Sequence, residues 1–177
     1  MTASATLDPP ASHPIRSKFG RRKFDKQPTQ TATVLIASTG EAIPRSVIRD
    51  AVRTSEGGAV AVVTIARIYG SALGLPNPGL MPTRKEMNEQ RAHVEEAIRL
   101  IEKAGAEAWG QVAATRKSAK TIAEAAVARG VAHVIVVRPE QPRWREVVEG
   151  NLVKEVAKKL GPQVKVVGVS PDVKGTR

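Results

Sequence analysis

The stretch TATVLIAS, residues 31 to 38, is a run of apolar and β-branched residues without polar alternation. A strand with one exposed face would alternate apolar and polar side chains, so this run predicts a strand buried on both faces. The same pattern returns in AVAVVTIA (59–66), AHVIVV (132–137) and VKVVGV (164–169), and more weakly in EAWGQVAA (107–114). We therefore expect five strands in one buried sheet.

Between these strands lie four segments whose apolar residues recur at helical spacing. Glycine follows each of them closely, as is typical of helix ends. The segments are residues 42–55, 84–104, 118–129 and 145–160. Strict alternation of strands and helices predicts an α/β fold in which helices cover both faces of a parallel sheet, with right-handed crossovers.

The composition favours one globular domain with an accessory tail. The chain has 177 residues, of which 41% are hydrophobic but only 3% aromatic, so the core is expected to consist of aliphatic side chains. Cysteine is absent, which excludes disulfides and thiolate chemistry and fits a reducing cytoplasm. No apolar run is long enough for a membrane helix, and the N-terminus lacks the apolar region of a secretory signal. We expect a soluble cytoplasmic protein.

The first 30 residues differ from the rest because they show no hydrophobic period. We predict three units: a basic arm at 1–30 that is disordered or ordered only on a partner, an α/β domain at 31–171 and a tail at 172–177. The chain carries a net charge of +11, which favours contact with polyanions or acidic proteins. Within the arm, cations with interleaved phenylalanines suit phosphates and stacked bases; these candidate partner-binding residues are Arg16, Lys18, Phe19, Arg21, Arg22, Lys23, Phe24 and Lys26.

Three blocks of the sequence resemble the universal stress protein family. They are VLIASTGEAIPRSVIRDAV (34–52), TRKSAKTIAEAAVARGVAHVIVV (115–137) and VEGNLVKEVAKKLGPQVKVVGV (148–169), which match the family in order and spacing. The resemblance implies a five-stranded parallel sheet of order 3-2-1-4-5, and dimers that often join through their last strands. Lys165 in the last strand is an edge charge that would oppose such pairing.

The resemblance also implies a place for a nucleotide, at the carboxyl edge between strands one and four. ATP-binding members have an Asp after strand one and a Gly-x2-Gly-x9-Gly-Ser/Thr loop after strand four. Here Thr39 stands in the place of the Asp, and Gly40 is kept. The closing pair is Gly150-Asn151, and Arg138 replaces the first glycine. These five residues are the candidate cofactor-binding set.

The loop after strand four is poor in the features that hold phosphate. Gln141 stands where the family has its second early glycine, and eight residues separate Gln141 from Gly150 where the family has nine. Pro139 and Pro142 remove two N–H donors. The Arg138 guanidinium suits phosphate and would compensate in part. We therefore expect no ATP hydrolysis, and either no cofactor or a weakly held ATP or other adenine nucleotide.

Other chemistry has little support in the sequence. His13, His93 and His133 lack metal-ligand spacing, and neither a nucleophile elbow nor a P-loop is present. Trp109 and Trp144 suit a core or an interface better than a pocket. The long Gly- and Pro-rich loop at 69–83 is typical of binding segments, although its role stays open.

The sequence leaves three functional hypotheses. The first is a non-catalytic binding or regulatory module that docks a polyanionic or acidic partner, such as nucleic acid, a ribonucleoprotein or a protein complex, through residues 16–26. The second is a stress sensor that binds ATP or another adenine nucleotide. The third is an accessory subunit of a larger assembly. A homodimer is compatible with each of them.

Overall fold

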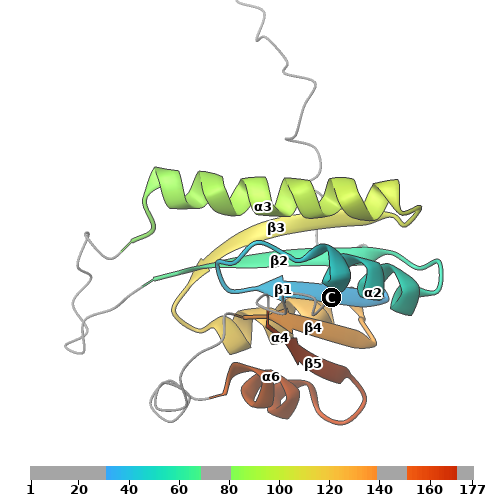
Figure 1. Ribbon diagram of the computed structural model, residues 1–177. Helices are drawn as coiled ribbons and strands as arrows, with labels where there is room; N and C mark the ends of the chain where they lie inside the picture. The colour runs from blue at the N-terminus through green and yellow to red at the C-terminus, as the bar shows by residue number, and fades with distance from the viewer. Residues whose placement is uncertain (1–30, 69–80, 139–150, 171–177) are drawn as a thin grey trace, which may run out of the picture.

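The computed structural model describes residues 31–68, 81–138 and 151–170. These residues form one five-stranded sheet of order β3-β2-β1-β4-β5 in which every pairing is parallel (Figure 1). The strands are β1 (Val34–Ser38), β2 (Val60–Arg67), β3 (Ala108–Thr115), β4 (His133–Val137) and β5 (Lys165–Val169). The fold class and the strand order expected from the sequence are both confirmed.

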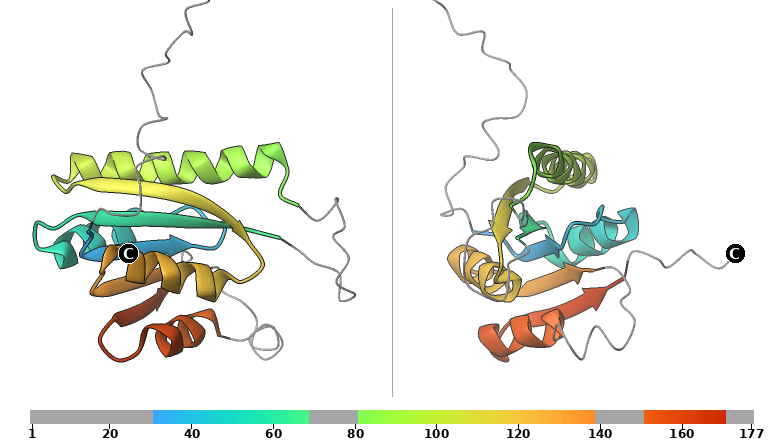
Figure 2. Two further views of the ribbon diagram at one scale, coloured as in Figure 1. Left: turned by 180° about the vertical axis from the view of Figure 1, so that it is seen from behind. Right: turned by 90° about the vertical axis from the view of Figure 1, so that its left-hand side faces the viewer.

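The helices form two layers, one on each face of the sheet (Figure 2). They are α2 (Arg45–Ser55), α3 (Arg84–Lys103), α4 (Ser118–Arg129) and α6 (Leu152–Leu160). Alternate residues of β1 belong to opposite cores: Val34 and Ile36 pack with α2 and α3, and Leu35 and Ala37 pack with α4 and α6. All five residues of β1 are buried, as the run without alternation predicts.

The helix ends follow the local signals, with small shifts. The first helix begins at Arg45 instead of residue 42, because Pro44 is its extended N-cap residue and has a φ of −62°. Gly130 ends α4 in the left-handed conformation with a φ of 62°. The last helix begins at Leu152, after the extended N-cap residue Asn151, so the expected continuous helix over residues 145–160 is wrong at residue 151.

Aliphatic side chains dominate the core, as the composition indicates. Trp109 is 4% exposed and packs in the core on the α4 side of the sheet, which confirms a core position for this residue. Trp144 lies outside the described residues. No helix in the described ranges combines the length and apolar character needed to cross a membrane.

Candidate functional site

The carboxyl ends of the strands meet at one edge of the sheet, and β1 lies there between β2 and β4. Ligands of open α/β sheets bind at such a point because the connections diverge from it. Thr39 and Gly40 follow β1, and Arg138 follows β4. The Thr39 N–H donates to the Val137 carbonyl at 3.3 Å, so the ends of the two strands are in contact.

Thr39 is buried at this edge, with 8% of its surface exposed. Its hydroxyl oxygen, Oγ1, has no hydrogen-bond partner among the described residues. The chain then turns at Gly40, whose φ of 110° suits glycine. The Ser38 hydroxyl donates to the Glu41 carbonyl and closes this turn. Thr39 is thus a buried hydroxyl on a fixed backbone.

Gln90, which was not among the candidate residues, is the second buried polar side chain at this edge. It belongs to α3 and is 8% exposed. Its Nε2 donates to the Gly40 carbonyl at 3.0 Å, while its Oε1 has no partner in the described part of the chain. The Thr64 hydroxyl of β2 lies 3.5 Å from the Gln90 backbone carbonyl. Gln90 therefore lies at the end of β1, level with Thr64 of β2, which continues for three more residues.

A sequence signal for Gln90 did exist. Met87, Val94, Ile98 and Ile101 form the apolar stripe of α3, and Gln90 stands three residues after Met87 and four before Val94. A polar residue in a stripe that faces the core is buried, and a buried amide needs partners. The apolar stripe by itself locates the helix, whereas the polar exception in it marks Gln90.

On the other side of β1, Asn151 begins α6. Its side-chain Oδ1 accepts from the N–H groups of Val153 at 3.1 Å and Lys154 at 3.2 Å. Asn151 is thus an N-cap residue, and two helix donors that would suit an anion are already paired with it. Gly150 lies outside the described residues. Asn151 therefore lies at the expected edge, but its Oδ1 already accepts hydrogen bonds from the first turn of α6.

Arg138 continues the contact between the last two strands. Its N–H donates to the Val169 carbonyl at 3.1 Å, and its side chain is half-buried. Next to it in the sheet, Ser170 follows β5, and its hydroxyl oxygen is also buried without a partner in the described ranges. Thr39, Gly40 and Arg138 are therefore brought to one edge, as expected, and their binding roles stay predictions.

The remaining candidates lie outside the described residues or away from this edge. The arm residues 16–26, the loop residues 69–80 and His13 lie outside the described residues. His93 is on α3, and His133 begins β4 at the opposite edge of the sheet. Across the described ranges, no group of three His, Asp or Glu side chains is placed to hold a metal ion.

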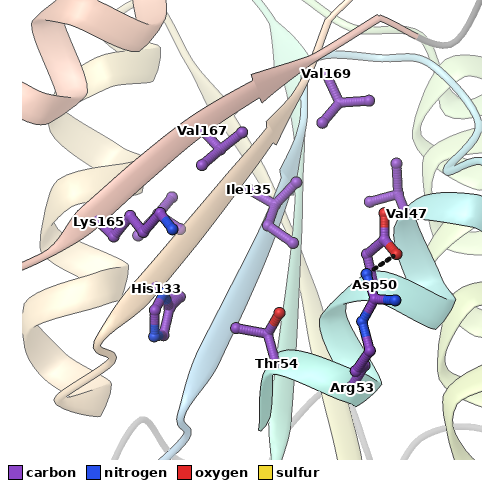
Figure 3. A pocket seen from close by; sticks show the side chains of 10 residues that line it. Val47, Asp50, Arg53, Thr54, His133, Ile135, Lys165, Val167 and Val169 are labelled. Carbon is purple, nitrogen blue, oxygen red and sulfur yellow. Dashed lines mark hydrogen bonds and ion pairs between the residues drawn. The ribbon is translucent and has the colours of Figure 1, made fainter.

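A second feature is a groove of about 220 Å³ between α2 and strands β4 and β5 (Figure 3). Its floor is apolar, and Val167 of the edge strand is 42% exposed beside it. An ion pair of Asp50 with Arg53 at 2.9 Å lies on the helix side. The other lining residues are Val47, Thr54, His133, Val134, Ile135, Lys165 and Val169.

The described fold is similar to two solved structures of a universal stress protein from Archaeoglobus fulgidus. One shares 13% identity, covers 79% of this chain and 93% of that chain, and has a TM-score of 0.51. This chain has the universal stress protein fold. The other structure, determined in complex with dAMP, shares 15% identity over 78% of this chain and 96% of that chain, with a TM-score of 0.50.

At these identities the comparison establishes the fold alone, and it confirms at that level the resemblance seen in the sequence blocks. No protein-family model matches the chain, and no curated protein matches it. The universal stress protein fold is therefore the architecture of this chain, while the chemistry of the edge depends on the residues that form it.

Proposed function

We propose that this protein is a non-catalytic binding module that holds an adenine nucleotide at the carboxyl edge, between β1 and β4. The observation that carries the proposal is the pair of buried polar atoms at this edge, Thr39 Oγ1 and Gln90 Oε1, which lack partners in the described residues. Buried polar atoms are nearly always paired with protein, water or ligand. The dAMP complex of the similar fold supports the choice of ligand class.

The absence of catalysis is part of the proposal. The buried polar side chains at the described edge are hydroxyls and one amide, none of which ionises near neutral pH. The Asn151 cap also leaves fewer helix donors for phosphate. We expect ATP to bind without hydrolysis, so phosphate release from ATP stays at the rate seen without protein.

Calorimetry on the full chain tests this function directly. Titration with ATP is expected to give a dissociation constant between about 10 μM and 1 mM, because few donors are left for the phosphates. Thr39→Val removes the hydroxyl at nearly constant volume and is expected to weaken binding several-fold. Thr54→Val, in the groove beside β5, is the matched control and should leave the affinity unchanged. Wild-type protein that takes up no adenine nucleotide at millimolar concentration would end the proposal.

The basic arm carries a second function, which is independent of the edge. Six cations and two phenylalanines within residues 16–26, in a chain of net charge +11, favour a polyanionic partner or an acidic protein surface. Oligonucleotide binding by the full chain and by a chain lacking residues 1–30 separates this function from nucleotide binding. An accessory role in a larger assembly would use the same arm, and native co-purification with mass spectrometry identifies such an assembly.

Self-association through β5 completes the proposal. β5 is at the end of the strand order, and Val167 is exposed beside an apolar groove. An edge strand with exposed apolar residues pairs readily with another strand. Lys165, which is also exposed, weakens such pairing but stands at the first position of the strand. We propose a homodimer that functions in the cytoplasm.

A further inference from the structure

The orientation of the Gln90 amide can be deduced from its one contact. Nε2 donates to the Gly40 carbonyl at 3.0 Å, and this carbonyl accepts hydrogen bonds but cannot donate. Rotating the amide by 180° would bring Oε1 against the Gly40 oxygen, so that two acceptors would face each other. Oε1 is therefore held as an acceptor and requires a donor from elsewhere.

Bulk water does not satisfy this requirement, because Gln90 and Thr39 are each 8% exposed. Leaving a buried acceptor without a donor is costly, so such atoms are normally paired in the working state of a protein. The Thr39 hydroxyl, one residue before Gly40, is unpaired as well. Thr39 Oγ1 and Gln90 Oε1 therefore belong to one region of the edge, around the turn at Gly40. A ligand that carries a hydrogen-bond donor would satisfy Gln90 Oε1 there.

The place of Gln90 along the edge indicates which part of a nucleotide it meets. Gln90 contacts Gly40 after β1 and lies next to Thr64 of β2. Arg138 follows β4, and α6 begins beyond it, on the other side of β1. A guanidinium attracts phosphate, whereas the first donors of α6 are paired with Asn151. A nucleotide with its phosphates toward Arg138 therefore has its base toward β2, beside Gln90.

Resting on the nucleotide-binding function proposed above, we propose that Gln90 is a specificity-determining residue that selects a 6-amino purine. Its fixed Oε1 accepts a hydrogen bond from the exocyclic amino group of adenine. Guanine and hypoxanthine carry a carbonyl at this position, which would face Oε1 as a second acceptor. The Gln90 amide cannot turn to donate instead without losing the Gly40 contact.

The expected consequence is a preference between ligands that differ at one position of the base. ATP should bind about tenfold or more tightly than ITP, because the 6-oxo base leaves two buried acceptors opposed. Purine riboside triphosphate, which lacks the amino group, should bind about as weakly as ITP. Thr39→Val should weaken ATP and ITP equally, because its hydroxyl does not distinguish the two groups.

The experiment is calorimetric titration of the full chain with these three ligands, for wild type and Gln90→Met. The variant keeps the side-chain length and should bind ATP and ITP equally, at the weaker affinity. Gln163→Met, an exposed glutamine before β5, is the matched control and should keep the preference. Thermal denaturation verifies that each variant is folded.

The outcomes separate this inference from the function on which it rests. Equal affinity of the wild type for ATP and ITP would overturn the role of Gln90 while leaving nucleotide binding intact; an ordered water would then satisfy Oε1. Wild-type protein that binds none of the three ligands would overturn both. If Gln90→Met does not fold, the ligand series on the wild type still decides, because it removes the amino group without changing the protein.

Discussion

Arg129 is the buried cation of the α4 layer, with 3% of its surface exposed. Its Nη2 lies 3.3 Å from Gln111 Oε1 and its Nη1 lies 3.4 Å from the Ala125 carbonyl, so both hydrogen bonds are long. Its Nε has no partner, and no carboxylate of the described residues pairs with it. Burial lowers the pKa of this guanidinium, which reflects the cost of keeping the charge out of water.

Replacing Arg129 with methionine is therefore expected to stabilise the protein. A buried charge without a carboxylate partner among the described residues is removed while most of the side-chain volume stays. Replacing buried ion pairs by apolar side chains has gained about 1–4 kcal/mol in other proteins, and a lone buried charge has even less to offset its desolvation. Urea denaturation of Arg129→Met should show a higher midpoint. Arg53→Met, at an exposed ion pair, is the control and should change the free energy of unfolding by less than about 0.5 kcal/mol. A loss of stability in Arg129→Met would mean that the cation has an anionic partner in solution.

Gly110 shows how closely α3 packs on β3. A Cβ at this position would overlap the buried Val94 side chain and lie 3.1 Å from the Val62 carbonyl. Gly110→Ala should lower the free energy of unfolding by about 1–3 kcal/mol, because the core has no room for another carbon. Ala114→Val adds volume at an exposed position of the same strand and should change stability far less. Equal urea midpoints for Gly110→Ala and the wild type would show that α3 is looser than described.

Among the helices, α3 has the best-defined start. Thr83 and Glu86 form a capping box: the Glu86 carboxylate accepts from the Thr83 N–H at 2.6 Å, and the Thr83 hydroxyl accepts from the Glu86 N–H at 3.2 Å. The Thr83 N–H, and then the Thr83 hydroxyl at 2.9 Å, donate to the carboxylate, and these two hydrogen bonds lower the pKa of Glu86 below its ordinary value. The carboxylate is thus favoured in the folded protein relative to the unfolded chain.

This shift gives a pH dependence with a definite sign. The stabilisation from Glu86 is fully present above the ordinary pKa that the carboxyl has in the unfolded chain, and is lost as the pH falls through the lower pKa of the folded protein. Glu86→Gln should therefore lose less stability than the wild type when thermal denaturation is followed from pH 6 to pH 3. Glu95→Gln, an exposed position on α3 outside the cap, serves as the control. Identical pH profiles for wild type and Glu86→Gln would contradict the cap.

The edge strand β5 is the element on which self-association depends. Val167→Lys places a charge at the centre of the strand and should convert the proposed dimer to monomer, as measured by light scattering. Val127→Lys is a matched control, because Val127 is 71% exposed on α4, away from this edge. If the wild type is already monomeric at micromolar concentration, β5 is not the interface.

For the whole molecule, the strongest prediction concerns the arm. Binding of a single-stranded oligonucleotide should weaken steeply with salt, with a log–log slope of about −4 if all six arm cations contact phosphates. Deleting residues 1–30 should remove most of this affinity while leaving ATP binding unchanged. Phe19→Ala with Phe24→Ala should weaken binding without changing the slope, because stacking releases no counterions. An unchanged affinity after the deletion would refute docking through the arm.

The sequence allowed the fold to be predicted well and the candidate site only in part. Apolar β-branched runs without polar alternation and glycines that end helices are local signals. They predict five strands, four helices and the order of these elements along the chain, whereas the order of the strands in the sheet came from the family resemblance. Thr39, Gly40 and Arg138 were located by the resemblance to the universal stress protein motif, whose positions directly follow strands one and four. Gln90 was missed because it lies in the middle of a helix, and its partner Gly40 is fifty residues away in the sequence.

The sequence by itself determined the α/β architecture, the depth of β1 in the sheet and the basic character of the arm, because these follow from side-chain periodicity and charge. Only the tertiary structure decided which polar atoms meet at the carboxyl edge. The packing of α3 on β2 and β3 brings an amide to the turn after β1, fixes its orientation and leaves one acceptor without a partner in the described residues. Hydrogen bonding between distant segments depends on three-dimensional distance, which no local pattern encodes.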